Sequence, residues 1–489
     1  MSSLRPRAFR AAPAPREKAA RVRSNLEVNP FGHTVRRRYR AMAGAIVGVI
    51  LAGSILWNLV APHPDPQVTA MQRRGYPTTL AGLDAWYPAV PPVENAALIY
   101  TNAFAHLTNS TGKVTNFISR PWLPFFGRPL AAPYREEVVS ILAANQEALR
   151  LLQSVPAAAR SRYPLDLTEG YTLGLPHLVQ SRTAVFLLAS QGLLQAGDGN
   201  AEAAAASFLA AGRVAESLAE EPLIVSQCVR CREWEALLQR LERAVSLARF
   251  TDGQLAALQA QVQLAERPQA VLRSWVAEWV SAEVAFHDPR MWDSAFRGSA
   301  GLLPRSRGFH VADLPPWGRA GCRTFLQVIG LQERDRVFCS NYLACRVAAM
   351  ELPYPARFAA LQRLASVTNS PGRAGPFSQL ILTVLPRFDP HDAEHAARVR
   401  VAAVALGLER FRLAHGGALP DSLGDLRLPG LESPLLDPFD GQPLRYRRRG
   451  ADYVVYSVGS DLKDDGGANW ESNYLKTPSD IGFVSLRSF

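Results

Sequence analysis

The sequence predicts a mainly α-helical protein with one N-terminal transmembrane helix, a helical extracytoplasmic body and a small α+β C-terminal domain. Three observations predict this fold class. An uncharged apolar run follows a basic segment, apolar residues recur at helical spacing through the middle of the chain, and the C-terminal part combines one long helical pattern with three short alternating segments. We expect a tail at 1–40, the membrane helix at 41–61, the body at 67–385 and the last domain at 389–489.

The positive charge of the chain is concentrated in its first 40 residues. The 489 residues carry a formal net charge of +11, but residues 1–40 contain 11 Lys or Arg and two acidic residues. That segment therefore carries +9, which leaves +2 for the other 449 residues. A near-neutral body disfavours a nucleic-acid groove. The tail itself is rich in Pro, Ala and Arg, and we expect it to be disordered.

Residues 43–60 form an uncharged apolar run of eighteen residues, which as a helix is about 27 Å long and close to the thickness of a bilayer core. Six Lys or Arg lie in 21–40 and only two in 61–80, so the positive-inside rule places the N-terminus in the cytoplasm and the long C-terminal part in the periplasm. A cleaved signal peptide is the alternative. We favour an uncleaved inner-membrane anchor, because the basic lead is long and the end of the run is a poor cleavage site.

Three small residues, Gly44, Gly48 and Ala52, recur every four positions in this run. Small residues at that spacing let two membrane helices approach closely, which would give a homo-oligomer. The alternative is that Gly and Ala are simply frequent in membrane segments.

The body shows a succession of helical patterns separated by turn residues. We predict helices at 95–107, 136–152, 178–194, 201–220, 224–248, 252–264, 273–286 and 325–351. Thr251 is a candidate N-cap, and 112–133 and 297–319 are predicted loops. The break at 197–200 resembles a tetratricopeptide-type helical hairpin, but no second copy follows at that period. Helical domains of this kind commonly bind partners between their hairpins.

The five cysteines include one C-x-x-C pair, Cys228 and Cys231. A zinc site would need a second pair, and a redox motif would begin a helix, whereas this pair lies inside a predicted helix. We interpret it as structural. In an oxidising compartment Cys339 or Cys345 could form a disulfide, and the odd count leaves at least one thiol unpaired.

One motif would give catalysis. His391, Glu394 and His395 match H-x-x-E-H, in which two histidines one helical turn apart bind zinc and the glutamate activates water. Glu471 is a conceivable third ligand. The competing interpretation is an ordinary helix start, because acidic residues are favoured in a first helical turn. Neither a P-loop nor a G-x-S-x-G elbow is present in the sequence.

The C-terminal segment has its own layout. A helical pattern runs from Ala396 to Leu413 and ends at Gly416-Gly417, and a short helix at 423–426 is predicted to be capped by Asp421. Alternating segments at 444–448, 453–457 and 481–486 predict three strands. This order implies a helix packed across one face of a small antiparallel sheet.

Residues 408–417, 419–423, 437–446 and 457–461 together resemble the soluble domain of the major pseudopilin of type II secretion. The resemblance implies a long helix on a three-stranded sheet and a bound calcium ion. Its ligands would be Asp461, Asp464, Asp465 and Asn469. The chain departs from that family because its apolar helix lies far upstream and no pseudopilin processing site is visible. We therefore do not expect it to polymerise as a pseudopilin.

The residues themselves give a physical case for calcium. Three carboxylates within five residues repel one another unless a cation or solvent compensates, and Gly466-Gly467 lets the backbone turn around an ion. The alternative is a solvated acidic turn, and the EF-hand pattern fits this loop poorly because Lys463 occupies its third position.

The whole chain is also similar to uncharacterised membrane-anchored proteins of Planctomycetes- and Verrucomicrobia-type bacteria, a resemblance that implies no activity. We expect a non-catalytic, single-pass, anchored periplasmic protein that interacts with the membrane and with other envelope or secretion proteins. The alternative is a membrane-anchored zinc-dependent hydrolase that uses the motif at 391–395.

Overall fold

The computed structural model describes residues 66–108, 127–156, 160–291, 314–368, 378, 389–427, 435–467 and 480–487, together with Met42, Gly44, Gly48, Ala52 and Gly53. The chain divides into two compact units, Met1–Ala61 and Pro62–Phe489.

The five described residues of the first unit are helical and exposed, and they include Gly44, Gly48 and Ala52. The rest of the predicted membrane segment at 43–60 lies outside the described residues. Within the described ranges, no helix combines the length and the apolar character needed to cross a membrane.

The described part of the second unit is mainly helical, as predicted. Its α-helices are α2 (Pro66–Arg73), α3 (Leu80–Trp86), α4 (Ala96–Ala105), α6 (Ala132–Ala144), α7 (Gln146–Gln153), α8 (Pro176–Gly197), α9 (Ala201–Glu216), α10 (Ile224–Leu247), α11 (Asp252–Leu264), α12 (Pro268–Ala285), α14 (Pro316–Val328), α15 (Leu331–Met350), α16 (Ala356–Thr368) and α18 (Asp389–Ala414). Short 3₁₀ helices are η1 (Pro92–Glu94), η3 (Leu167–Thr172) and η7 (Leu423–Asp425). The strands are β1 (Arg445–Arg449), β2 (Asp452–Ser457) and β3 (Ile481–Ser485).

Two of the predicted helices are each divided in two. The helix predicted at 136–152 breaks at Asn145, whose buried side chain donates from Nδ2 to the carbonyl of Ile141 (2.9 Å) and accepts from the backbone N–H of Thr108 (2.9 Å). The helix predicted at 325–351 breaks at Gly330, which has a left-handed φ of 72°. Asn and Gly both tolerate chain reversals that apolar periodicity does not reveal.

Other local expectations are confirmed. Thr251 caps α11 in a reciprocal capping box with Gln254. α8 ends at Gly197, as the turn residues of 197–200 predicted, and Asn200 caps α9 by accepting from the backbone N–H of Ala203 (3.1 Å). α8 and α9 then pack against each other along their length as a helical hairpin.

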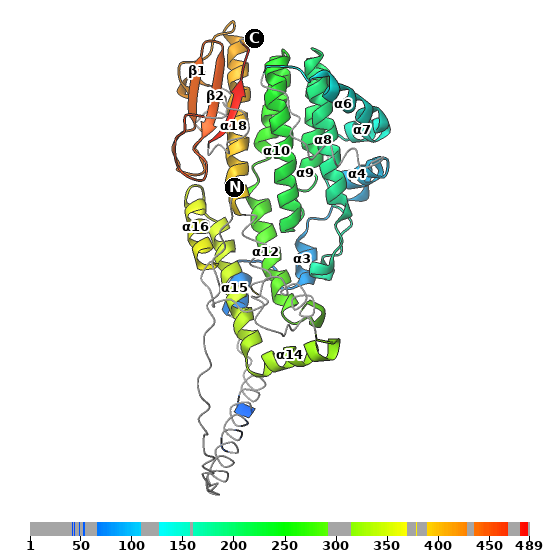
Figure 1. The fold of residues 1–489 in the computed structure, drawn as a ribbon, viewed down its shortest axis with the longest axis vertical. Coiled ribbons are helices and arrows are strands. Elements are labelled where there is room, and N and C mark those ends of the chain that lie inside the picture. Colours follow the sequence, from blue (N-terminus) through cyan, green and yellow to red (C-terminus); the bar gives the residue numbers. More distant parts are fainter. Residues whose placement is uncertain are drawn as a thin grey trace, which may run out of the picture. The chain divides into compact units, whose positions relative to one another are not determined.

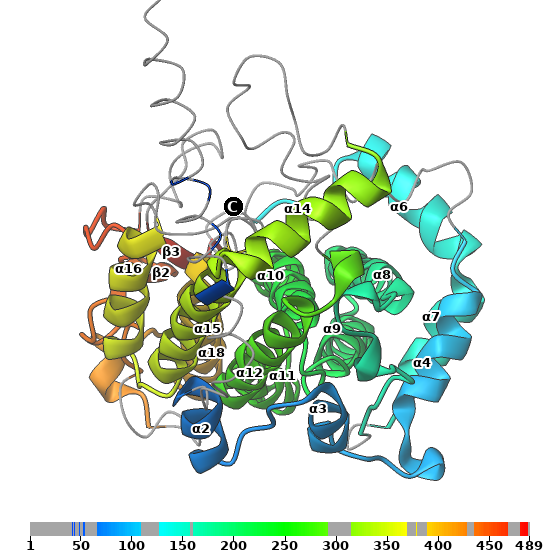
Figure 2. The ribbon, with the colours of Figure 1, turned by 90° about the horizontal axis from the view of Figure 1, so that it is seen from below.

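The helices are stacked in layers, which the end-on view of Figure 2 shows. α4, α6 and α7 cover α8 and α9, which in turn pack on α10 and α11. α12 and α15 pack together below this stack in Figure 1 and enclose a second apolar cluster around Trp275 and Trp279.

α18 joins the helical body to the C-terminal sheet. One side of α18 packs on α10 and α11, and another side packs on β2 and β3 (Figure 1). A single cluster of buried residues includes Leu241 of α10, Leu406 of α18 and Phe483 of β3. The C-terminal segment therefore shares its hydrophobic core with the body.

The sheet is antiparallel with the order β1-β2-β3, and the predicted helix across one of its faces is confirmed. β2 is buried along its whole length, because α18 covers one side and its neighbours flank it. β1 forms an edge and consists of Arg445-Tyr446-Arg447-Arg448-Arg449, whose charges disfavour pairing with another strand.

The glycine pair after α18 acts as predicted. Gly416 and Gly417 both have left-handed φ values (64° and 98°), and the N–H of Gly417 donates to the carbonyl of Arg412 (2.8 Å). The predicted cap of the following short helix is wrong. Ser422 caps η7, whereas the exposed Asp421 forms an ion pair with Arg448 (2.6 Å).

One buried carboxylate explains the motif pair 437–441 and 457–461. Asp437 accepts hydrogen bonds from the backbone N–H of Phe439 (3.0 Å) and of Val458 (2.9 Å) and from the hydroxyl of Ser457 (2.9 Å). Nη1 of Arg445 also donates to the Asp437 carboxylate (2.9 Å). A fully buried charge is tolerated only with such compensation, so the turn at 437–441 and the end of β2 are fixed together through this side chain.

We predict that Asp437→Ala lowers the free energy of unfolding by about 3 kcal/mol, because it leaves two backbone N–H groups and the Ser457 hydroxyl without their acceptor. Chemical denaturation of the full chain measures this difference. Asp421→Ala is the matched control, since its carboxylate is 85% exposed, and it should change the stability by less than about 0.5 kcal/mol. Equal effects of the two substitutions would contradict the assignment.

Candidate functional site

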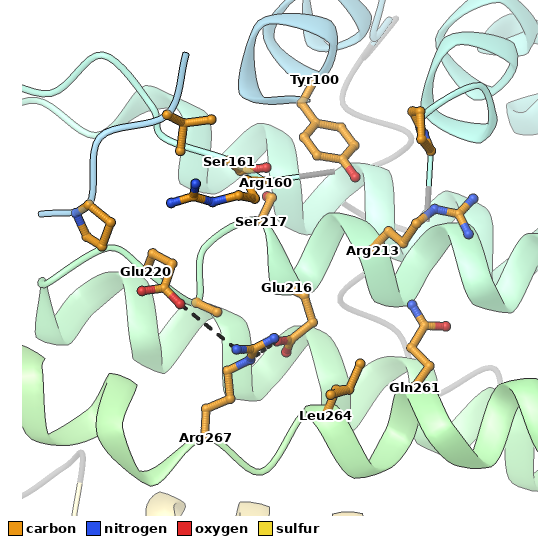
Figure 3. Close-up of a pocket in the computed structure, with 14 residues that line it drawn as sticks. Tyr100, Arg160, Ser161, Arg213, Glu216, Ser217, Glu220, Gln261, Leu264 and Arg267 are labelled. Atoms are coloured by element: carbon orange, nitrogen blue, oxygen red, sulfur yellow. Dashed lines mark hydrogen bonds and ion pairs between the residues drawn. The ribbon is translucent and has the colours of Figure 1, made fainter. Parts of the chain in front are cut away.

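A pocket of about 430 Å³ opens on the helical body where α9 and α11 end (Figure 3). The residues that line it come from segments that are far apart in the sequence: the chain after α3, the body of α4, the segment before η3, the end of α9, the end of α11 and the residue preceding α12. Its lining residues are Pro88, Val90, Tyr100, Pro156, Arg160, Ser161, Arg213, Glu216, Ser217, Ala219, Glu220, Gln261, Leu264 and Arg267. This size suits a small organic ligand or a short peptide segment.

The close approach of α9 and α11 forms one wall of the pocket. Gly212 faces Gln261, and a Cβ at position 212 would lie 2.6 Å from the Gln261 side chain. Gln261 in turn donates from Nε2 to the carbonyl of Leu209 (2.9 Å). A residue larger than glycine at 212 would displace this side chain and open the wall.

The opposite side is fixed by the backbone of the segment before η3. Residues Asn95 and Arg160 form an isolated parallel bridge, in which the N–H of Ala96 donates to the carbonyl of Arg160 (2.8 Å). Asn95 also donates from its side chain to the carbonyl of Arg162 (2.8 Å). These bonds hold the backbone of Arg160 at the pocket while its side chain stays exposed.

Glu216 is surrounded by donors. Its Oε1 accepts from Nη1 of Arg230 (3.0 Å) and from the indole N–H of Trp234 (2.8 Å). Its Oε2 accepts from Nε of Arg267 (2.5 Å), an interaction drawn in Figure 3. The carboxylate is therefore neutralised by two guanidinium groups, one of which, Arg230, is completely buried behind the pocket wall.

Glu220 is compensated in the same way. Arg273 donates to its Oε2, and Nη1 of Arg267 lies 3.9 Å from its Oε1. The lining residues and the groups paired with their carboxylates thus comprise five arginines and two glutamates, an excess of three positive charges.

The predicted calcium ligands lie on an exposed turn after β2. Asp461 accepts from the backbone N–H of Lys463 (3.1 Å), and Asp464 accepts from that of Gly466 (2.9 Å) and from the Tyr456 hydroxyl (3.0 Å). Asp465 is exposed, and Asn469 lies outside the described residues. In the described ranges, no three His, Cys, Asp or Glu side chains are grouped as metal ligands.

Sequence reasoning missed the carboxylate that holds this turn. Asp480 is buried and accepts from the backbone N–H of Gly467 (2.7 Å) and of Asp465 (3.4 Å). Burial raises the pKa of Asp480, and the backbone donors oppose that effect. Arg447 adds a bond to the carbonyl of Gly466 (3.1 Å). The lone acidic residue preceding β3 was the available signal for this role.

The H-x-x-E-H motif lies at the start of α18. The side chain of His391 and all of Glu471 are outside the described residues, and Glu394 is half-buried. His395 is buried and its Nε2 donates to the carbonyl of Ala265 (3.0 Å). Burial, and secondarily Arg230, lowers the pKa of His395 to about 3, so its imidazole is neutral. The described contact thus uses His395 to attach α18 to the end of α11.

The C-x-x-C pair lies inside α10, as predicted, and all five cysteines are free thiols. Burial raises the pKa of Cys231 to about 12 and raises that of Cys228 further. Because the thiolate is the reactive form, these protonated thiols are poor nucleophiles and poor metal ligands.

A buried acid lies on α10 close to Arg230. Glu233 follows Arg230 by three residues on α10 and is only 1% exposed. Burial raises its pKa to about 8, against the opposing effects of Ser181 and Arg230. At neutral pH its carboxyl group is therefore mostly protonated in the folded chain, while in the unfolded chain it is ionised.

This shift predicts a pH-dependent stability. Between the unfolded pKa of 4.5 and the folded pKa of about 8, the folded chain holds a proton that the unfolded chain has released, so the contribution of Glu233 to stability falls as the pH rises through this range and is lost above it. We expect Glu233→Gln to be more stable than the parent by about 3 kcal/mol near pH 9 and by much less near pH 5, measured by chemical denaturation. Arg232→Gln, on the exposed face of α10, is the control. A difference that does not vary with pH would contradict the assignment.

The two metal predictions are checked together by melting and metal analysis of the purified chain. A structural calcium ion at 461–469 predicts a lower melting temperature after chelation, because loss of a bound ligand destabilises the folded state. Zinc bound by His391 and His395 predicts a stoichiometric zinc content that His395→Gln removes. An unchanged melting temperature contradicts the first prediction, and absence of zinc contradicts the second.

Comparisons with known proteins add no relative: no protein-family model, no curated protein and no solved structure matches this chain. The function is therefore argued from the pocket and its charges.

Proposed function

We propose that this chain is a single-pass, membrane-anchored protein whose periplasmic helical body binds a ligand or a segment of a partner protein in the pocket where α9 and α11 end. The observation that carries the proposal is the combination of an open pocket of about 430 Å³ with a lining in which both carboxylates are already compensated by arginine. The charged groups that such a lining offers to a ligand are therefore positive.

The same contacts favour binding over catalysis. A general base must be able to accept a proton from the substrate, but Glu216 and Glu220 accept hydrogen bonds or ion pairs from arginine. Ser217 donates to the carbonyl of Val214 (2.6 Å) and lies 3.0 Å from the Tyr163 hydroxyl, without a histidine base among the lining residues. We therefore propose a non-enzymatic role.

The predicted anchor at 43–60 and the charge step across it support the location of the body in the periplasm, with the N-terminus in the cytoplasm. Gly44, Gly48 and Ala52 are the proposed contacts of a homo-oligomer within the membrane. The proposed partners are other envelope or secretion proteins.

The order of α18 and the three strands supports the proposed pseudopilin-like character of 389–489. Because this segment shares its core with α10, we propose that it serves as a fixed part of the body. A pseudopilin subunit, by contrast, assembles through its own apolar helix.

One crosslinking experiment tests both the location and the pocket. Leu264 lines the pocket and is 57% exposed, whereas Val179 on α8 is 72% exposed and is not a lining residue. Leu264→Cys and Val179→Cys are made in a Cys345→Ala background, because Cys345 is the exposed thiol among the five. A membrane-impermeant maleimide carrying a photoreactive group is then added to spheroplasts that express the full chain.

We expect both cysteines to be labelled from outside, and only the cysteine at 264 to give a discrete crosslinked product, identified by mass spectrometry. Absence of labelling at both positions contradicts the periplasmic location. Labelling at both without a product specific to 264 contradicts a binding role for the pocket.

A further inference from the structure

We infer that the pocket selects a ligand that bears a carboxylate on an apolar stem, and that Arg213 holds the carboxylate. This inference rests on the proposed binding function of the same pocket and adds the chemical class of its ligand. The carboxylate belongs either to a small organic acid or to an acidic residue or C-terminus of a peptide, and the experiment below distinguishes these sources.

Charge is distributed unevenly between the back and the lining of the pocket. Arg230 and Arg273 approach Glu216 and Glu220 from outside the lining, and Arg267 bridges the same two glutamates. Three arginines thus serve two carboxylates. Two of the three excess positive charges belong to the other lining arginines, Arg160 and Arg213, for which the structure gives no acidic partner within the described residues.

Of these two arginines, Arg213 is the stronger candidate for binding a carboxylate. It lies near the end of α9, and its Nε is buried without a hydrogen-bond partner among the described residues. Burial lowers the pKa of Arg213, because removal from water disfavours the charged form. A guanidinium in this position gains most from an anionic ligand, because a carboxylate both compensates the charge and accepts hydrogen bonds in a planar fork.

A neutral donor lies beside it. Tyr100 points from α4 toward the region between Ser217 and Arg213 in Figure 3. Burial raises the pKa of Tyr100, so its hydroxyl keeps its proton and can donate to an oxyanion. Arg213 and Tyr100 together offer donors and no acidic acceptor.

Arg160 lies on the other side of Tyr100 in Figure 3, where its guanidinium points away from that of Arg213 and adds positive charge to the lining. Its backbone is fixed by the bridge with Asn95, and its guanidinium makes one long contact, from Nη2 to the carbonyl of Ala89 (3.4 Å). An exposed arginine on a fixed backbone can reorient toward a ligand at little cost in backbone conformation.

The remaining lining favours a carboxylate with an apolar stem over a bare inorganic anion. Val90, Pro88, Pro156 and the half-exposed Leu264 contribute apolar surface around the arginines. The volume of about 430 Å³ is also much larger than a hydrated phosphate needs. Burial of an apolar stem against Leu264 would add affinity that an inorganic anion lacks.

The test measures binding to the full chain in detergent micelles by isothermal titration calorimetry. The probes are heptanoate, its neutral counterpart heptanamide, a blocked Leu-Glu-Leu peptide, the blocked Leu-Gln-Leu peptide and inorganic phosphate. We expect heptanoate or the Glu peptide to bind and its amide counterpart not to bind. Tighter binding of heptanoate identifies a free acid as the source of the carboxylate, and tighter binding of the Leu-Glu-Leu peptide identifies a peptide.

Arg213→Gln should weaken that binding by at least about tenfold, because a charge-assisted hydrogen bond contributes more than a factor of ten in affinity. Arg160→Gln should weaken it less. Arg150→Gln, at an exposed pair with Glu147 on α7, is the control and should bind as the parent does. Because the pocket disfavours the charge of Arg213, Arg213→Gln should fold, and its melting curve confirms this before titration.

Equal binding of acids and amides, equal binding of phosphate, an unaffected Arg213→Gln variant, or no binding of any probe would each overturn the inference. The crosslink at Leu264→Cys is independent of ligand charge. If that crosslink forms while the acids fail to bind, the proposed binding function stands and only the ligand class is wrong. If neither is observed, the proposed function fails as well.

Discussion

The buried guanidinium of Arg230 is the interaction on which the rest of the described structure depends. Its Nη1 donates both to Glu216 at the end of α9 (3.0 Å) and to the carbonyl of Ala265 after α11 (2.9 Å), and its Nε donates to Gln227 (2.9 Å). Removal of a guanidinium from water costs several kcal/mol unless such partners replace the solvent. The ends of three helices are therefore fixed together by the requirement to satisfy one charge.

The hydrogen bonds of Arg230 also connect the pocket to the C-terminal segment. The carbonyl of Ala265 also accepts from His395, so α18 is attached to the same point that fixes Glu216. α18 carries the three-stranded sheet, whose residues continue the hydrophobic core of the body. A change in the packing of α18 would accordingly affect the pocket through the carbonyl of Ala265 and the carboxylate of Glu216. The charge of the lining depends on the same contacts, because Arg230 compensates Glu216 and leaves an excess of arginine among the lining residues.

Local sequence patterns predicted most of the helices well. The bounds and the cap of α11, the hairpin of α8 and α9, and the helix followed by three strands were all predicted from apolar periodicity and turn residues. The errors have local causes that periodicity does not contain. Asn145 breaks a continuous apolar pattern by turning its side chain onto the backbone, and Gly330 does so by adopting a left-handed φ. Ser422 caps η7 in place of Asp421 because it directly precedes this helix and donates to Asp425 from its backbone N–H and its hydroxyl.

The sequence by itself determined where α8 to α12 and the three strands form, that the basic charge belongs to the first 40 residues, and that the C-x-x-C pair lies within a helix. Such properties depend on neighbours along the chain. Only the tertiary structure decided which charges are compensated, that Asp480 holds the acidic turn, and that arginines from three separate segments line one pocket. The physical reason is that the state of a side chain depends on the groups that folding brings against it. Those groups lie as far apart in sequence as Arg160 and Arg267.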